Sequence, residues 1–218
     1  MDLSKIIWSD VSDATIDTLN MLGFSTLFTI ILGLPIGILL FWTSGKEGTP
    51  KVVYTISSFI INILRSVPFV ILMIAVIPLT RSIVGTSIGV QAAIPPLVIA
   101  AAPFFARLVE TSLREVDRGV IEAAQAMGAS NRQIIWKVLL PESLPGLLAG
   151  MTITAVTLVS YTAMSGLIGG GGLGDLAYRY GYQRFETEMM IVSILVMLVL
   201  VQILQTIGDK LVSRFSRK

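Results

Sequence analysis

The sequence predicts an all-α polytopic membrane protein, with five membrane-spanning helices and a helical hairpin on the cytoplasmic side. Hydrophobic residues make up 54% of the 218 residues and charged residues only 14%. The mean hydropathy is +0.81, and the charges gather in short clusters between long apolar tracts. A water-soluble domain of this size needs a charged exterior, so lipid surrounds most of this chain.

The lengths of the apolar tracts predict where the spans lie. A helix needs about 20 apolar residues to cross a hydrocarbon core about 30 Å thick, because each residue adds about 1.5 Å. Five crossings put the two termini on opposite sides of the membrane. The expected spans are residues 18–43, 57–80, 83–106, 143–168 and 189–208, with a cytoplasmic loop at 107–142, all in one domain over 1–218.

Lysine and arginine residues predict the orientation, since cytoplasmic loops carry an excess of both. Eleven basic residues lie in the loop 45–51, the segment 107–142 and the C-terminal tail, against four on the other side. We therefore expect a cytoplasmic C-terminus and an extracytoplasmic N-terminus. The eleven are Lys46, Lys51, Arg107, Arg114, Arg118, Arg132, Lys137, Lys210, Arg214, Arg217 and Lys218; the four are Lys5, Arg81, Arg179 and Arg184.

The composition excludes several kinds of chemistry. The chain has no cysteine and no histidine, which excludes disulfides, zinc sites built from those residues, and thiol or imidazole catalysis. The acidic residues lie near span ends or in loops, so we expect no buried carboxylate that could relay protons. The net charge of +2 is too small to indicate a nucleic-acid partner. We expect no catalytic residue and no metal site.

The expected spans are interrupted by one arginine and several prolines. Arg65 lies in the second span, where an arginine costs about 2.5–3.5 kcal/mol at the bilayer centre unless it pairs or reaches the interface. If that span begins near Ser57 or Ser58, Arg65 lies close to the cytoplasmic interface, which is the position we expect. The prolines predict kinks that neighbouring helices must cover. They are Pro35, Pro68, Pro78, Pro95, Pro96 and Pro103.

Residues 119–141, GVIEAAQAMGASNRQIIWKVLLP, predict a helix-turn-helix. Gly128 is placed to end the first helix, and Ser130 with Gln133 three residues later forms a capping box that opens the second. Four apolar residues of the first helix share one face at spacings i, i+3, i+4 and i+7. They are Val120, Ala123, Ala124 and Met127.

An apolar face on a cytoplasmic loop must be covered by another protein or by the membrane surface. A hairpin that rests on lipid has a polar face rich in lysine and arginine. This hairpin instead carries Glu122, Gln125 and Asn131. The sequence therefore favours docking onto a protein.

The segment Gly169–Gly174, GGGGLG, matches the G-x-G-x-x-G pattern of dinucleotide sites. It lacks the flanking strand-turn-helix unit, and it lacks the lysine and hydroxyl residue of a phosphate-binding loop, so we do not expect nucleotide binding. We expect an extracytoplasmic turn. The glycines would serve either a tight re-entrant turn or close packing under a docked protein.

The fourth expected span has many small and polar side chains. Such residues either line a conduit or let membrane helices pack closely, and both interpretations remain open. The candidates for a translocation path are Ser160, Tyr161 and Met164. Met164 is flexible and polarizable, so it is our candidate for narrowing the path.

One pattern in the hairpin resembles the EAA loop of ABC importer permeases. It consists of Glu122-Ala123-Ala124, three residues, Gly128, nine residues, Val138, one residue, then Leu140-Pro141. Val138 stands where the pattern more often has isoleucine. The resemblance implies that this helix sits in a cleft of an ATP-hydrolysing subunit and passes its closing motion to the spans. The implied coupling residues are Glu122, Ala123, Ala124, Met127, Gly128, Leu140 and Pro141.

The resemblance covers nearly the whole chain and fits methionine importers best. It lies in NILRSVPF (62–69), IPLTRSIVGTSIGVQAA (77–93), AAPFFARLVE (101–110) and SGLIGGGGLGDLAYRYGY (165–182). It implies the type I ABC importer permease fold, import of L- and D-methionine, and a location in the bacterial cytoplasmic membrane. It also implies a homodimer with two ATPase subunits, which bind ATP and Mg, and an extracytoplasmic methionine-binding protein. The alternative is another small solute, either a different amino acid or a quaternary amine.

Overall fold

A computed structural model describes residues 6–44 and 48–216, and the regular elements within these residues are all helices. Lys5, Lys46, Arg217 and Lys218, which contribute to the expected orientation, lie outside the described residues. Four helices are long and apolar enough to cross a membrane, and a bent pair makes a fifth crossing if it counts as one span. The four are α1 (Trp8–Thr43), α5 (Val90–Arg114), α9 (Leu144–Gly166) and α11 (Thr187–Phe215).

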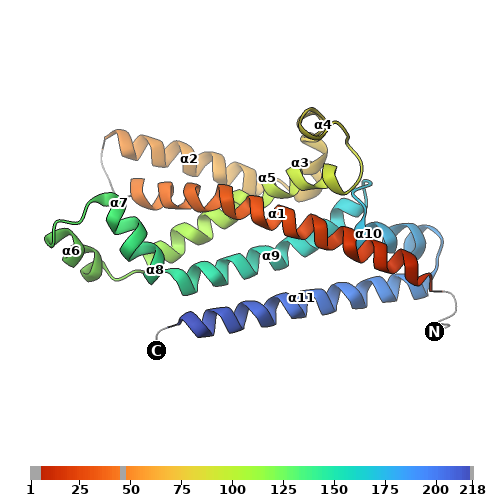
Figure 1. The fold of residues 1–218 in the computed structure, drawn as a ribbon. Helices are drawn as coiled ribbons and strands as arrows, with labels where there is room; N and C mark the ends of the chain where they lie inside the picture. The colour runs from red at the N-terminus through yellow and green to blue at the C-terminus, as the bar shows by residue number, and fades with distance from the viewer. Residues whose placement is uncertain (1–5, 45–47, 217–218) are drawn as a thin grey trace.

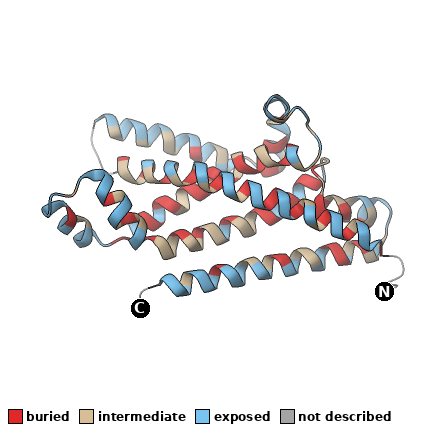
Figure 2. Cartoon of the chain, in the orientation of Figure 1, coloured by how far each residue is buried: buried red, intermediate tan, exposed pale blue. Residues whose placement is uncertain are grey.

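The long helices run along one elongated bundle, with the N-terminus at one end and the C-terminus at the other (Figure 1). This arrangement confirms the expected all-α class. In α5, 67% of the most apolar stretch is buried, against 17% in α11. Helix α5 is therefore central, whereas α11 and α2 (Thr49–Ser66) lie outside and are mostly exposed (Figure 2).

Helices α1 and α5 approach each other closely through small residues spaced four apart on α1. Ser25, Thr29, Gly33 and Gly37 are all buried. A Cβ atom on Gly37 would lie 2.5 Å from the Cβ of Val109 and 2.6 Å from the carbonyl oxygen of Ala106. Small residues at this spacing let membrane helices approach to backbone contact. The α1–α5 pair is the rigid centre of the bundle.

The second span differs from the expected range 57–80. Helix α2 begins at Thr49 and ends at Ser66, and α3 (Phe69–Ala75) leaves it at an angle of 105°. Val67 is extended, with φ −78° and ψ 127°, because the residue before a proline is disfavoured in the helical region. A third short helix, α4 (Ile77–Val84), follows. The proline at position 68 therefore breaks the span and does not merely kink it.

The third span also differs from the expected range 83–106. Gly85 ends α4 with φ 83°, and Gly89 precedes α5 with φ 95°, so α5 begins only at Val90. It then continues to Arg114, through residues 107–114 that were assigned to the cytoplasmic loop. The ends of the other long helices also differ from the ends of their apolar tracts. Backbone hydrogen bonding decides where a helix ends, and it does not stop where hydropathy falls. Helix α1 begins at residue 8, α9 covers 144–166, and α11 covers 187–215.

The glycine-rich segment forms a tight turn at the end of the bundle where the described N-terminus lies. Gly169, Gly171 and Gly172 all have positive φ. After them, α10 (Gly172–Leu176) continues into the π-helical η3 (Ala177–Gln183). The N–H of Leu173 donates to Oγ1 of Thr18 at 2.8 Å, so the turn packs directly on α1. The expected turn is present, and packing under a docked protein stays a prediction.

Candidate coupling site and translocation path

The predicted hairpin begins with helix α6 (Arg118–Ala126), which projects at the end of the bundle opposite the N-terminus (Figure 1). The carboxylate of Asp117 caps its start by accepting the N–H of Gly119 at 2.6 Å. Gly128 follows its end with φ 78°, and the N–H of Ala129 donates to the carbonyl oxygen of Ala124 at 3.0 Å. This is a Schellman turn, so the predicted glycine cap is confirmed.

The second arm of the hairpin opens with the predicted capping box. The N–H of Ser130 donates to Oε1 of Gln133 at 2.8 Å, and the N–H of Gln133 points back to Oγ of Ser130. The arm returns to the bundle through one turn of α-helix, a π-helical segment and a last short turn. These are α7 (Asn131–Ile134), η2 (Ile135–Leu139) and α8 (Leu140–Glu142).

The last two predicted coupling residues lie where this arm joins the bundle. Pro141 is exposed, and Leu140 is half-buried. The N–H of Leu140 donates to the carbonyl oxygen of Ile135, five residues back, which makes the segment before the proline π-helical. Since proline has no N–H, the regular ladder could not continue through position 141.

The four apolar residues of the predicted first helix, three in α6 and Met127 directly after it, do not share one environment, contrary to expectation. Met127 is 82% exposed and Val120 42%, and Ala123 is also exposed. Ala124 is only 4% exposed because it turns toward the bundle together with half-buried Ile121. Val120, Ala123 and Met127 therefore form an exposed apolar surface, which we call the outer face of α6. Exposed Glu122 lies beside it.

The inward side of the hairpin packs against three long helices. Its contacts form one apolar cluster, which we call the hairpin core. Its buried members are Phe105, Val109, Leu113, Val116, Ala124, Ile134, Leu139 and Leu147, and half-buried Ile38, Phe41 and Trp42 pack against it.

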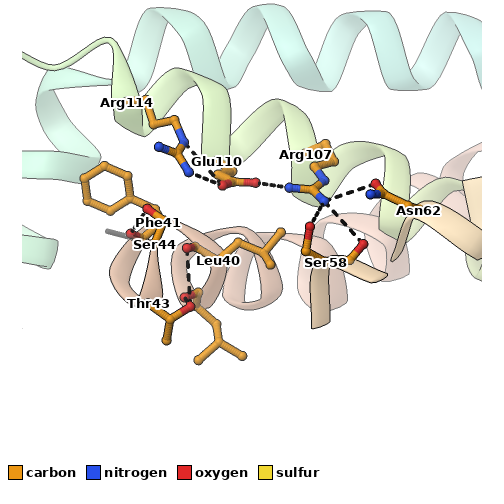
Figure 3. Close-up of polar contacts among 10 residues, drawn as sticks. Leu40, Phe41, Thr43, Ser44, Ser58, Asn62, Arg107, Glu110 and Arg114 are labelled. Carbon is orange, nitrogen blue, oxygen red and sulfur yellow. Dashed lines mark hydrogen bonds and ion pairs between the residues drawn. The ribbon is translucent and has the colours of Figure 1, made fainter. Parts of the chain in front are cut away.

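A buried carboxylate lies close to the hairpin core, on helix α5 and not in the loop to which the sequence assigned it. Glu110 on α5 is 3% exposed, and its two oxygens accept Arg107 at 2.6 Å and Arg114 at 2.7 Å. Arg107 also donates to Oγ of Ser58 and, at 3.1 Å, to Oδ1 of Asn62, both on α2 (Figure 3). Since both carboxylate oxygens are paired, the group ties α2 to α5. It is not poised to relay protons.

The structure brings two of the three predicted path residues together. Ser160 and Met164 line an open groove of about 540 Å³ between α9 and α11, and Met164 is 42% exposed. Tyr161 is not among the groove residues. Its ring stacks on Phe69 of α3 with centroids 4.4 Å apart and planes 2° from parallel. Tyr161 therefore contacts the broken second span, a contact for which the sequence gives no local pattern.

Apolar spans long enough to cross a bilayer define an integral membrane protein. The chain belongs to the family described as the inner membrane component of binding-protein-dependent transport systems, which it matches over residues 33–217.

Several relatives are similar over almost their whole length. The probable D-methionine transport system permease protein MetI of Vibrio cholerae is 52% identical over 207 residues, which cover 94% of this chain and 92% of that protein. The methionine import system permease protein MetP of Bacillus subtilis is 46% identical, with 92% and 91% covered.

Solved structures share the fold. An inward-facing structure of the MetNI methionine ABC transporter aligns over 100% of both chains, with a TM-score of 0.94 and 45% identity. An amino acid ABC transporter with histidines covers 99% of this chain and 97% of its own, with a TM-score of 0.74 and 19% identity. The second similarity concerns the fold alone.

Proposed function

We propose that this chain is the permease subunit of an ATP-driven methionine importer and translocates L- and D-methionine across the bacterial cytoplasmic membrane. The observation that carries the proposal is the outer face of α6. Met127, 82% exposed, and Val120, 42% exposed, form an apolar surface at a capped helix, while Ala124 on the same helix is built into the hairpin core. The names of the relatives supply the solute.

The working importer would contain two copies of this chain, two ABC ATPase subunits and an extracytoplasmic methionine-binding protein. ATP and Mg would bind to the ATPases, and this chain would hold neither a cofactor nor a catalytic residue. The α6 end of the bundle would face the cytoplasm together with the C-terminus, which lies at the same end (Figure 1). The basic residues Arg118, Arg132, Lys137, Lys210 and Arg214 support that orientation.

ATP binding would close the two ATPases on the outer faces of both α6 helices. Because Ala124 belongs to the hairpin core, that motion would reach α5 and α9 without crossing a flexible segment. Side chains of the hairpin core contact one another, so a displacement of α6 would be passed on as a tilt of the spans. The groove lined by Ser160 and Met164 would then open alternately to each side.

Reconstitution tests this proposal. The permease is placed in proteoliposomes with its ATPase and its binding protein, and uptake of labelled L-methionine is followed with and without ATP. We expect uptake that requires ATP and is competed by D-methionine, but not by a quaternary amine. ATP-dependent uptake of a different solute with no methionine uptake would overturn the assignment of the solute.

A further inference from the structure

Helix α2 has two faces of opposite character. Tyr54, Ser58, Asn62 and Arg65 recur at i, i+4, i+8 and i+11, so they share one face, which we call the polar stripe of α2. The opposite face is apolar and exposed, and it suits contact with lipid. Its members are Val52, Ile56, Phe59, Ile60 and Ile63, which are 48–65% exposed. A helix that turns one face to lipid turns the other to protein or water.

Helix α5 covers only the lower part of the polar stripe. Arg107 of α5 bonds to Ser58 and Asn62, but Asn62 and Arg65 remain exposed. The guanidinium of Arg65 lies 5.8 Å from the centre of the Phe104 ring. It pairs with no carboxylate in the part of the chain that the structure describes.

The position of Phe104 gives the depth of Arg65 in the membrane. Phe105, the next residue of α5, lies at the level of Gly33, since its Cδ1 would be 2.8 Å from a Cβ on Gly33. From Gly33 to Thr43, where α1 ends, the helix rises about 15 Å, which is half of a hydrocarbon core about 30 Å thick. With the edge of the hydrocarbon core placed at Thr43, Arg65 lies near the middle of the bilayer.

This depth differs from the expectation that Arg65 lies close to the cytoplasmic interface. That expectation placed the start of the span near Ser57, whereas α2 starts at Thr49 and so has two more helical turns below Arg65. An arginine at the bilayer centre is costly and, where one occurs, it faces a bundle interior or a water-filled cavity.

We propose that the polar stripe of α2 lines the cytoplasmic half of the translocation path, and that Arg65 binds the carboxylate of the amino acid in transit. A guanidinium presents two parallel N–H donors that match the two oxygens of a carboxylate. Phe104, under the guanidinium, would hold its plane in place. This inference rests on the proposed function, because it takes an amino acid as the solute.

The first test asks whether the stripe faces water. The chain has no cysteine, so each single-cysteine variant of it carries one thiol. Arg65→Cys and Asn62→Cys are compared with Ile63→Cys, which lies on the apolar face of α2 at a similar depth. The importer is assembled with cysteine-free partners in proteoliposomes and treated with a charged, membrane-impermeant thiol reagent.

We expect the two stripe cysteines to react at least about tenfold faster than the cysteine at position 63, because only water-exposed thiols ionise and react. Equal rates at positions 63 and 65 would show that Arg65 faces lipid or protein, and would overturn the inference. Excess methionine should slow labelling of Asn62→Cys, whereas methioninol, which lacks the carboxylate, should not.

The second test asks whether Arg65 recognises the carboxylate. Arg65→Gln should lower the initial rate of methionine uptake about tenfold or more, and it should abolish the protection of Asn62→Cys by methionine. Arg65→Lys keeps the charge but loses the paired N–H donors, so its uptake rate should lie between those of the unmodified importer and Arg65→Gln. Normal uptake and normal protection in Arg65→Gln would overturn the inference. Absence of methionine uptake by the unmodified importer would instead overturn the proposed function.

Discussion

The backbone N–H of Ala129 donates to the carbonyl oxygen of Ala124 at 3.0 Å, across the turn that ends α6. Ala124 is the residue of α6 that is built into the hairpin core, at 4% exposure. The hydrogen bond therefore joins the turn to a point where α6 is held by the bundle. It fixes the direction in which the outer face of α6 points.

Replacement of Gly128 should disturb that direction. The residue has φ 78°, and a Cβ placed on it would meet nothing within 4 Å, so the strain is purely that of the backbone. Gly128→Ala should cost about 1–2 kcal/mol. Gly128→Pro should be far worse, because proline fixes φ near −65° and removes the N–H that donates to Gln125 at 2.9 Å.

The measurement for Gly128 is the amount of ATPase that co-purifies with the permease. Gly23→Ala is the matched control, since Gly23 is also in open space but has an ordinary helical φ. We expect normal membrane insertion for all three variants and loss of the ATPase only for those at position 128, most severely for proline. Full ATPase recovery with Gly128→Pro would show that the turn does not position α6.

A charge on the outer face of α6 should prevent docking without unfolding the hairpin. Met127 is 82% exposed, so Met127→Asp removes no internal contact of importance. Burying an unpaired carboxylate in an interface costs at least about 1–3 kcal/mol, which is about a tenfold to hundredfold loss of affinity for the ATPase. Met127→Leu keeps the volume and should bind normally. Equal affinities of the two variants would place the ATPase contact elsewhere.

Removal of the Glu110 charge should loosen the contact between α2 and α5. Breaking a fully buried ion pair costs about 3–5 kcal/mol. We expect about 2–3 kcal/mol here, because the Arg114 side chain is 48% exposed and stays partly hydrated. Glu110→Gln should therefore lower the melting temperature of the purified permease by several degrees. Glu115→Gln, an exposed position at the end of α5, is the control and should leave the melting temperature unchanged.

A large side chain at Gly37 should separate α1 from α5. Even a Cβ atom there would lie 2.5 Å from the Cβ of Val109, and the backbone oxygen of Ala106 cannot move aside. Gly37→Leu should cost more than the ~1–3 kcal/mol usual for overpacking and should sharply reduce the amount of intact permease extracted from membranes. Gly23→Leu, which meets open space, should be extracted in normal amounts. Equal yields would mean that the close contact is dispensable.

Features encoded by neighbouring residues were predictable. The cap at Gly128 and the box formed by Ser130 and Gln133 depend on residues a few positions apart, and both are present. The long helices were predictable as well, because about 20 apolar residues suffice to identify a span. Their exact ends were not, since hydrogen bonding within α5 continues through Arg107 and Glu110 to Arg114.

Features that depend on residues far apart were not predictable. The Arg107–Ser58 contact joins positions 49 residues apart, so the burial of Glu110 has no local pattern. The depth of Arg65 follows from its position beside Phe104, and therefore from the packing of α2 on α5. The stacking of Phe69 on Tyr161 requires the 105° bend between α2 and α3, which a single proline does not specify.

The most direct measurement of the central claim is the rate of ATP-driven methionine uptake by an importer whose permease has residues 118–129 replaced by a glycine-serine linker. The claim is that force from the ATPase enters the bundle through α6 and the hairpin core. The assay contains the ATPase and the binding protein. The claim predicts that the altered permease inserts into the membrane and that ATP-driven uptake falls to the level measured without ATP. Uptake at the unmodified rate would contradict it.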